Sequence, residues 1–350
     1  MAPTTSKSLI EQAVSVTSSA SVRPERFTNT YPLWLPPTAR GIYGGTFISQ
    51  SLSAAQSTVP ADFTAHSIQS QFVRAGTYDK PLVYDVDRVS DGRSFAVRSV
   101  KILQKGQVVF VAIVGLTRAS DQTSRAIAHA EPMPPNVPRP SDEISELESA
   151  LDPRPTHHRG AYVTKRVGIT KSTGSLPERR IHQWFKSRHP LSSFSGLQVQ
   201  QAALAYMCDN YLIQAAPHVN RFFDFVRPPQ SEADIGGRDL AFGSRSHDTM
   251  PASDREKAEK EGRPRIGMMV SLSHTMYFHH PKHVKVDQWM LSEVGSYWTG
   301  DGRGLATQKI WSSDGVLLAS SYQEGVIRLA EDDRDIEIGR LENKTSNSKL

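Results

Sequence analysis

The sequence predicts an α+β chain in which one unit, a helix followed by an antiparallel sheet, occurs twice. A run beginning at Asp91, DGRSFAVRSVKILQKGQVVFVAIVGLTR, has a counterpart that begins 210 residues later at Asp301, DGRGLATQKIWSSDGVLLASSYQEGVIR. A helical pattern precedes the strand-rich part of each half. Strands do not alternate with helices, as they would in a parallel sheet built from βαβ units.

The elements of the two halves correspond in order. The helical segment is GTFISQSLSAAQSTV in the first half and LQVQQAALAYMCDNYLI in the second. The segments PLVYDVDRVS, SFAVRSVKILQ and VVFVAIVGLTR match WMLSEVGSYW, GLATQKIWS and VLLASSYQEGVIR, and D-G and K-G turn signals separate these β-rich runs. Upstream of them, Phe72 aligns with Phe278 at an offset of 206. One long helix wrapped by a curved antiparallel sheet is the hot-dog arrangement, so two copies predict a double hot dog.

Composition shifts divide the chain into parts. They are a disordered leader (1–24), a first repeat without catalytic residues (25–120), a Pro-rich linker (121–178), a second repeat with the catalytic residues (179–335) that contains an insertion loop (228–265), and a tail (336–350).

Overall composition narrows the function classes. The net charge of +5 is spread along the chain, so no nucleic-acid partner is expected. The one cysteine, Cys208, excludes an internal disulfide and indicates a reducing compartment. No apolar run approaches the roughly 20 residues of a membrane span. The sequence ends in Ser348, Lys349 and Leu350, a receptor-read peroxisomal address that predicts delivery to the peroxisomal matrix by the import receptor.

Asp209 is a charged residue in an apolar part of the sequence, which indicates a specific role for its carboxylate. In LAYMCDNYLIQAAP it lies on the apolar stripe of the expected helix, which also includes Ala205, Tyr206 and Ile213. A buried charge is costly unless something pairs with it or uses it. The stripe of the first helix, which includes Ile48, contains no carboxylate.

Two further positions show the same asymmetry between the copies. The alignment places Ser271 against Ala65 and Gln323 against Ile113. A carboxylate can act as a general base toward water, and a hydroxyl and a side-chain amide can orient that water or donate to an oxyanion. We therefore predict that Asp209, Ser271 and Gln323 form one catalytic site, present once in the chain.

The sequence resembles the type II acyl-CoA thioesterases. The similarity rests on YGGTFISQSLSAA, HSIQSQFVRAG, DGRSFAVRSV, YMCDNYL, SHTMYFHHP and SSDGVLLASSYQEGVIR, and it covers residues 30–118 and 180–330. The resemblance implies a double hot dog that hydrolyses fatty acyl-CoA thioesters. It also implies that Asp209, Ser271 and Gln323 are the catalytic set. Members of the family often have an acidic residue before the strand histidine, where this chain has Ser273.

Other constellations carry weaker signals. His274, His279, His280 and His283 crowd one segment, but no Asp, Glu or Cys joins them at a metal spacing, so no metal site is expected. His66 could act as a base near neutral pH, yet it lies in the copy without the carboxylate, which favours a structural role.

A glycine-rich motif and three arginines could serve binding functions. The glycines of GIYGGTF do not follow a strand within a βαβ unit, so they do not form a dinucleotide loop, and they more plausibly permit a close backbone approach. Arg74, Arg93 and Arg303 could meet CoA phosphates, although each also fits an ordinary surface position.

The function predicted from the sequence is hydrolysis of fatty acyl-CoA to fatty acid and CoA in peroxisomal lipid metabolism, with water activated by Asp209 and without a cofactor. Two alternatives stay open: a hot-dog enoyl-CoA hydratase, and a non-catalytic acyl-CoA binding protein. Because a hot-dog sheet has free edges and an outer face that needs cover, a homo-oligomer, most simply a dimer, is also predicted.

Overall fold

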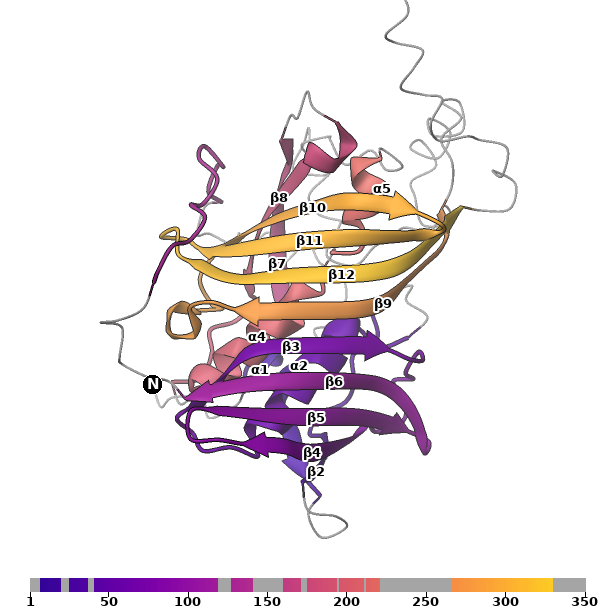
Figure 1. The fold of residues 1–350 in the computed structure, drawn as a ribbon, viewed down its shortest axis with the longest axis vertical. Coiled ribbons are helices and arrows are strands. Elements are labelled where there is room, and N and C mark those ends of the chain that lie inside the picture. Colours follow the sequence, from indigo (N-terminus) through magenta and orange to yellow (C-terminus); the bar gives the residue numbers. More distant parts are fainter. Residues whose placement is uncertain are drawn as a thin grey trace, which may run out of the picture.

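The computed structural model describes residues 7–19, 25–36, 41–118, 127–140, 160–170, 175–193, 195–210, 212–220 and 266–329. Its main feature is one antiparallel sheet of 12 strands that curves around the helices. Figure 1 shows the sheet as one layer and α1, α2 and α4 as a second layer behind it. The insertion predicted at 228–265 and the tail predicted at 336–350 lie outside the described residues.

The described part of the first half contains eight elements. They are α1 (Leu9–Val14), β1 (Val16–Ser18), β2 (Arg26–Asn29), α2 (Gly44–Gln56), β3 (Phe63–Phe72), β4 (Val83–Asp91), β5 (Phe95–Gln104) and β6 (Gln107–Arg118). The second half contains β7 (Tyr162–Thr170), the 3₁₀ turn η2 (Leu176–Glu178), β8 (Arg180–Ser187), α4 (Leu197–Cys208), α5 (Ala215–Val219), β9 (Ile266–Phe278), η4 (Pro281–His283), β10 (Met290–Gly300), β11 (Arg303–Ser312) and β12 (Leu317–Leu329).

The strand order shows the duplication directly. The sheet runs β1-β2-β4-β5-β6-β3-β9-β12-β11-β10-β8-β7, so the second block of six strands repeats the first block in reverse order. The predicted two-copy α+β architecture is therefore confirmed. The halves join edge to edge where β3 pairs with β9 in the middle of the sheet.

The central strand pair has the register of a two-fold relation. Ser67 pairs with Tyr277, and Gln71 pairs with Ser273. An offset of 206 (273 minus 67, and 277 minus 71) carries Ser67 onto Ser273 and Gln71 onto Tyr277, so the two pairs exchange places. This offset is the one predicted from Phe72 and Phe278.

Two helices on the concave face make the centre of the core. The apolar side chains of Ile48 and Leu52 in α2, and of Leu204 in α4, are completely buried. Small residues such as Ala55 and Ala205 let the helices and the sheet approach closely. The two helices contact each other, and the N-terminal end of α2 lies against the C-terminal end of α4. This helix contact sets the position of the candidate site.

The prediction of a disordered leader at 1–24 is wrong for its described part. Ile10 and Val14 bury one face of α1, and a capping box between Ser8 and Glu11 starts that helix. Glu11 also accepts hydrogen bonds from Ser192 and Ser195, just before α4. These hydrogen bonds lower the pKa of Glu11 to about 2 although burial of the carboxyl acts to raise it. The predicted leader thus connects the two halves through hydrogen bonds from Ser192 and Ser195 to Glu11.

The predicted linker at 121–178 is also too long. Tyr162–Thr170 form β7, which pairs with β8 and is the counterpart of β1 in the strand order. Earlier in the predicted linker, the indole N–H of Trp184 donates to the Pro138 carbonyl (2.8 Å), and that of Trp311 donates to the Glu131 carbonyl (3.1 Å). A proline-rich composition suggests a free linker, but such a segment can also pack against a sheet as an extended chain. Composition alone therefore did not predict these contacts.

Candidate active site

The apolar stripe predicts that Asp209 lies within a helix, but the structure places it just beyond the helix end. It is the C-cap of α4, with φ −71° and ψ −6°, and the helix ends at Cys208. The chain turns immediately afterwards and begins α5 at Ala215. The apolar periodicity continues past the helix end because Ile213 and Ala216 contact the sheet from the turn and from α5. Asp209 as a whole residue is partly buried at this helix end.

The three predicted site residues meet in one hydrogen-bonded cluster. The Gln323 Nε2 atom, on β12, donates to Oδ1 of Asp209 (2.8 Å) and to Oγ of Ser271 on β9 (2.8 Å). Gln323 is only 1% exposed, whereas Asp209 and Ser271 are partly buried. A carboxylate can only accept hydrogen bonds, which requires the NH₂ end of the Gln323 amide to face Asp209.

The first half contributes the remaining wall of the site. The backbone N–H of Gly45, in the first turn of α2, donates to the Asp209 carboxylate. A Cβ atom at Gly44 would lie 2.5 Å from Asp209 Oδ2, and one at Gly45 would lie 2.3 Å from the Tyr206 carbonyl. Only glycine permits this approach, as the GIYGGTF motif predicted. The site therefore places a carboxylate against a helix N-terminus, an end that favours negative charge.

Burial sets the titration of the carboxylate. It raises the pKa of Asp209 from 3.8 to about 7, and the hydrogen bonds from Gln323 and Gly45 limit the rise. A general base works best when its pKa lies near the operating pH. Burial also raises the pKa values of the neighbouring Tyr43 and Cys208, so both side chains stay neutral and Asp209 carries the local charge.

The comparison between the copies holds, with one correction. Ala65 pairs with Leu116 next to a bulge in the first half, and Ser271 pairs with Gly325 next to a bulge in the second, which confirms that Ala65 and Ser271 are equivalent.

The counterpart of Gln323, however, is Val114 rather than Ile113. Ile68 pairs with Val114, and its equivalent His274 pairs with Gln323. Ile113 points to the outer face of the sheet and is 41% exposed, whereas Val114 is fully buried like Gln323. The identical D-G-R letters misled the alignment, because strand pairing relates Arg98 to Ala306 at an offset of 208 and Val114 to Gln323 at an offset of 209, whereas the letters give 210. The turn from β11 to β12 is one residue longer than the turn from β5 to β6, since Trp311 pairs with Leu317 whereas its equivalent Leu103 pairs with Val108.

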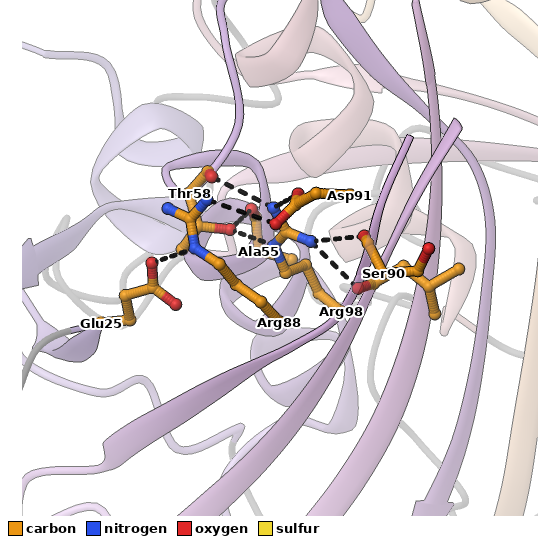
Figure 2. A network of polar contacts seen from close by, with 8 residues as sticks. Glu25, Ala55, Thr58, Arg88, Ser90, Asp91 and Arg98 are labelled. Atoms are coloured by element: carbon orange, nitrogen blue, oxygen red, sulfur yellow. Dashed lines mark hydrogen bonds and ion pairs between the residues drawn. The ribbon is translucent and has the colours of Figure 1, made fainter. Parts of the chain in front are cut away.

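An arginine occupies the corresponding region of the first half. Arg98 pairs with Val114 on the sheet, as Ala306 pairs with Gln323. Its fully buried guanidinium donates from Nε to Thr58 Oγ1 (2.6 Å), just beyond the C-cap of α2, and it also forms an ion pair with Asp91. Figure 2 shows this network, which Arg88 and Glu25 extend to the surface. The first half thus fills its equivalent space with a structural ion-pair network.

This network predicts a stability effect without a catalytic one. We expect Arg98→Met to lower the free energy of unfolding by about 2–4 kcal/mol, because it removes buried hydrogen bonds and leaves Thr58 and backbone carbonyls without their donor. Chemical denaturation of the wild type and the variant measures the change. Turnover per folded molecule should stay within about twofold, and a large loss of turnover in folded protein would contradict the structural assignment of Arg98.

The remaining sequence candidates do not join the cluster. His66 lies at the bulge of β3 and packs edge-on against Phe95, with ring centroids 6.1 Å apart. His279 bonds Ser320, and His280 bonds the Leu317 carbonyl. Among the described residues no group of His, Cys, Asp and Glu could hold a metal ion.

Two of the three arginines considered for CoA, Arg74 and Arg303, have other partners. Arg303 forms an ion pair with Glu324 (2.7 Å) and lies over the Trp298 ring. Arg74 donates to the Val108 carbonyl (2.9 Å). These contacts fit the ordinary surface role that was the alternative interpretation.

Comparison with known proteins identifies the family. The acyl-CoA thioesterase N-terminal domain matches residues 31–117, and the acyl-CoA thioesterase C-terminal domain matches residues 128–327. The chain belongs to the type II acyl-CoA thioesterase family. It is a thioester hydrolase, as the resemblance implied, and the two domain matches follow the two halves of the sheet.

Relatives span most of the thioesterase. Acyl-coenzyme A thioesterase 8 of Homo sapiens is 31% identical over 296 residues, covering 85% of this chain and 82% of the relative. The peroxisomal acyl-coenzyme A thioester hydrolase 1 of Saccharomyces cerevisiae is 23% identical over 342 residues, covering 87% of this chain and 90% of the relative.

Solved structures confirm the double hot-dog fold. The acyl-CoA thioesterase II TesB2 of Mycobacterium marinum has a TM-score of 0.63 at 23% identity, covering 92% of this chain and 98% of that one. A hot-dog protein of unknown function from Alicyclobacillus acidocaldarius has a TM-score of 0.59 at 18% identity, covering 91% and 97%.

Sequence reasoning missed one residue that the thioesterase places beside the cluster. His274 is fully buried and pairs on the sheet with Gln323. The sequence contains a signal for it, because its counterpart at the 206 offset is the apolar Ile68, but the neighbouring histidines suggest only a metal site.

Proposed function

We propose that this thioesterase hydrolyses fatty acyl-CoA by direct attack of a water molecule that Asp209 activates. The observation that supports the proposal is the cluster in which Gln323 Nε2 bridges Asp209 and Ser271. It joins a carboxylate whose pKa burial raises to about 7 to two polar groups, and the first half has apolar residues at the positions equivalent to Ser271 and Gln323.

The reaction follows from the properties of these groups. Asp209 accepts a proton from water as the water oxygen bonds the thioester carbonyl carbon. Gln323 and Ser271 place the water and stabilise the oxyanion that develops. When the tetrahedral intermediate collapses, the C–S bond breaks, and the CoA sulfur takes the proton from Asp209. The products are a fatty acid and free CoA, and Asp209 returns to its ionised form.

Release of free thiol from a fatty acyl-CoA tests the proposal. A thiol reagent should report CoA release by the purified protein, with the Asp209→Asn variant as the control for contaminating activity. An enoyl-CoA hydratase would add water to the double bond of an enoyl-CoA without releasing thiol. A binding protein would neither release thiol nor consume a double bond. Either result would contradict the proposed hydrolysis. A series of acyl-CoA substrates from short to very long chains would then define the preference.

We also propose that the thioesterase works in the peroxisome. The support is the Ser348-Lys349-Leu350 signal, which lies outside the described residues, together with the printed name of the Saccharomyces cerevisiae relative. We expect that deleting Leu350 from an N-terminally tagged protein moves it from peroxisomes to the cytosol, because the import receptor reads that tripeptide. Fluorescence microscopy against a peroxisomal marker measures this, and unchanged peroxisomal location would contradict the proposal.

A homodimer is proposed for the assembly. The outer face of the sheet exposes Ile113, Tyr277 and Tyr322, each at least 40% accessible. Ile113 and Tyr322 lie in one row across the four central strands, since Ile113 pairs with Gln69, Gln69 with Thr275, and Thr275 with Tyr322. Such a face is typically covered by a second subunit. Sedimentation should give a mass near twice 38.8 kDa, and a monomer of 38.8 kDa across working concentrations would contradict the dimer.

A further inference from the structure

The inner face of the second half contains an imidazole that the proposed reaction does not use. His274 on β9 is 0% exposed, and neither of its ring nitrogens has a hydrogen-bond partner within the described part of the protein. A buried polar group without a partner destabilises the folded state. Burial lowers the pKa of His274 to about 4, so near neutral pH the ring is neutral, with one N–H donor and one acceptor nitrogen.

The amide of Gln323 has the complementary requirement. Its Nε2 atom makes both contacts to the cluster, which leaves Oε1 as a buried acceptor without a partner in the described residues. His274 and Gln323 are directly paired across β9 and β12. Both side chains are buried on the inner face, where paired residues have Cβ atoms about 4.5–5.5 Å apart. In the structure the two groups are neighbours but are not hydrogen-bonded, and a change of side-chain torsion or one bridging water would join the imidazole N–H to Gln323 Oε1.

The first half supports a functional origin for this pair. The residues equivalent to His274 and Gln323 are Ile68 and Val114, which are paired with each other and fully buried. The fold therefore accepts an apolar pair at this place, and the polar pair occurs only beside Asp209.

We propose that His274 is a positioning residue of the thioesterase, whose ring N–H binds Gln323 Oε1 and thereby keeps Nε2 directed at Asp209 and Ser271. Without this donor the amide can rotate by half a turn, which would present Oε1 to the carboxylate and replace an attraction by a repulsion. His274 does not touch the reacting atoms. The inference rests on the proposed function, because its effect is exerted through the Asp209 cluster.

The test replaces His274 by the residue of the first half. We expect His274→Ile to lower kcat by about 10- to 100-fold with little change in KM, because the catalytic amide loses its orientation while the substrate surface is retained. The variant should still fold, with a thermal midpoint near that of the wild type, because the buried Ile68 occupies the equivalent position in the first half. His274→Asn and His274→Gln place an amide donor near the positions of Nδ1 and Nε2, and one of them should restore most of the turnover. These two variants also keep the test valid if the isoleucine variant folds poorly.

Two readouts separate positioning from a structural role. In a Gln323→Ala background, His274→Ile should cause little further loss, whereas a packing defect would lower turnover by the same factor in both backgrounds. The acid limb of kcat/KM should also move to higher pH in His274→Ile, because the Gln323 hydrogen bond lowers the pKa of Asp209. Tyr43, Tyr206 and Cys208, which also face Asp209, have raised pKa values and stay neutral over this range.

The outcomes distinguish this inference from the proposed function. Folded His274→Ile with normal turnover, or a loss equal in both backgrounds, would overturn the role of His274 while hydrolysis by the wild type stood. If the wild type releases no thiol, or if Asp209→Asn hydrolyses normally, the proposed function itself fails.

Discussion

Asp209→Asn is expected to lower kcat for fatty acyl-CoA hydrolysis by about 10²–10⁴, the usual contribution of a positioned acid–base group. Asparagine keeps the shape of the side chain and can still face Gln323, but it lacks the basic oxygen that accepts the proton from water. Thiol release measured at saturating substrate gives kcat for both proteins. KM should change little, since the acyl chain and CoA keep their contacts.

The pH dependence of the wild type belongs to the same prediction. Because Asp209 must be ionised to act as a base and its pKa is about 7, kcat/KM should fall about tenfold per pH unit below pH 7.

Asp209→Asn should raise stability although it lowers turnover. A carboxyl whose pKa is raised on folding binds its proton more tightly in the native state, so it costs stability as pH rises from 3.8 toward 7. Asp209→Asn should therefore melt above the wild type at pH 8, and the difference should disappear near pH 4. A folded Asp209→Asn enzyme with near-normal turnover would show that the base is elsewhere, with His66 the next candidate.

The duplication explains how much of this site could be predicted. Because each copy serves as a control for the other, the sequence identified Asp209, Ser271 and Gln323 without any structure. The same method failed at Ile113, since matching D-G-R letters do not reveal that a turn has changed length. Strand pairing corrects this error, because a shift of one residue moves a side chain to the other face of the sheet.

Other features depend on contacts between the halves. The end of α4 at Cys208 could not be predicted, because the apolar pattern continues through the turn and into α5. The role of α1 was hidden for a similar reason: its polar composition resembles a leader, whereas Glu11 finds its partners Ser192 and Ser195 far along the chain. The glycines of α2 suggested a close approach, but only the structure shows that the approached group is Asp209.

That approach leads to the second large effect, a loss of activity in Gly44→Ala. The new Cβ atom would lie 2.5 Å from Asp209 Oδ2 and 3.1 Å from the Phe72 ring. Real Cβ contacts are not this short, so the carboxylate must move away from the N-terminus of α2 or lose its alignment with Gln323. Misplacing a catalytic group by about 1 Å can cost about 10²-fold in rate, and we expect a fall in kcat of that order.

The matched control is Gly196→Ala at the N-cap of α4, the helix of the other half. A Cβ atom there meets no atom within 4 Å, so turnover should stay within about twofold. Circular dichroism and the thermal midpoint would verify that both variants are folded, because alanine is a good helix former and Gly44 does not have a positive φ. If Gly44→Ala folds and keeps wild-type turnover, the carboxylate has room to move without losing function. The close contact between α2 and Asp209 would then be a packing feature and not part of the catalytic geometry.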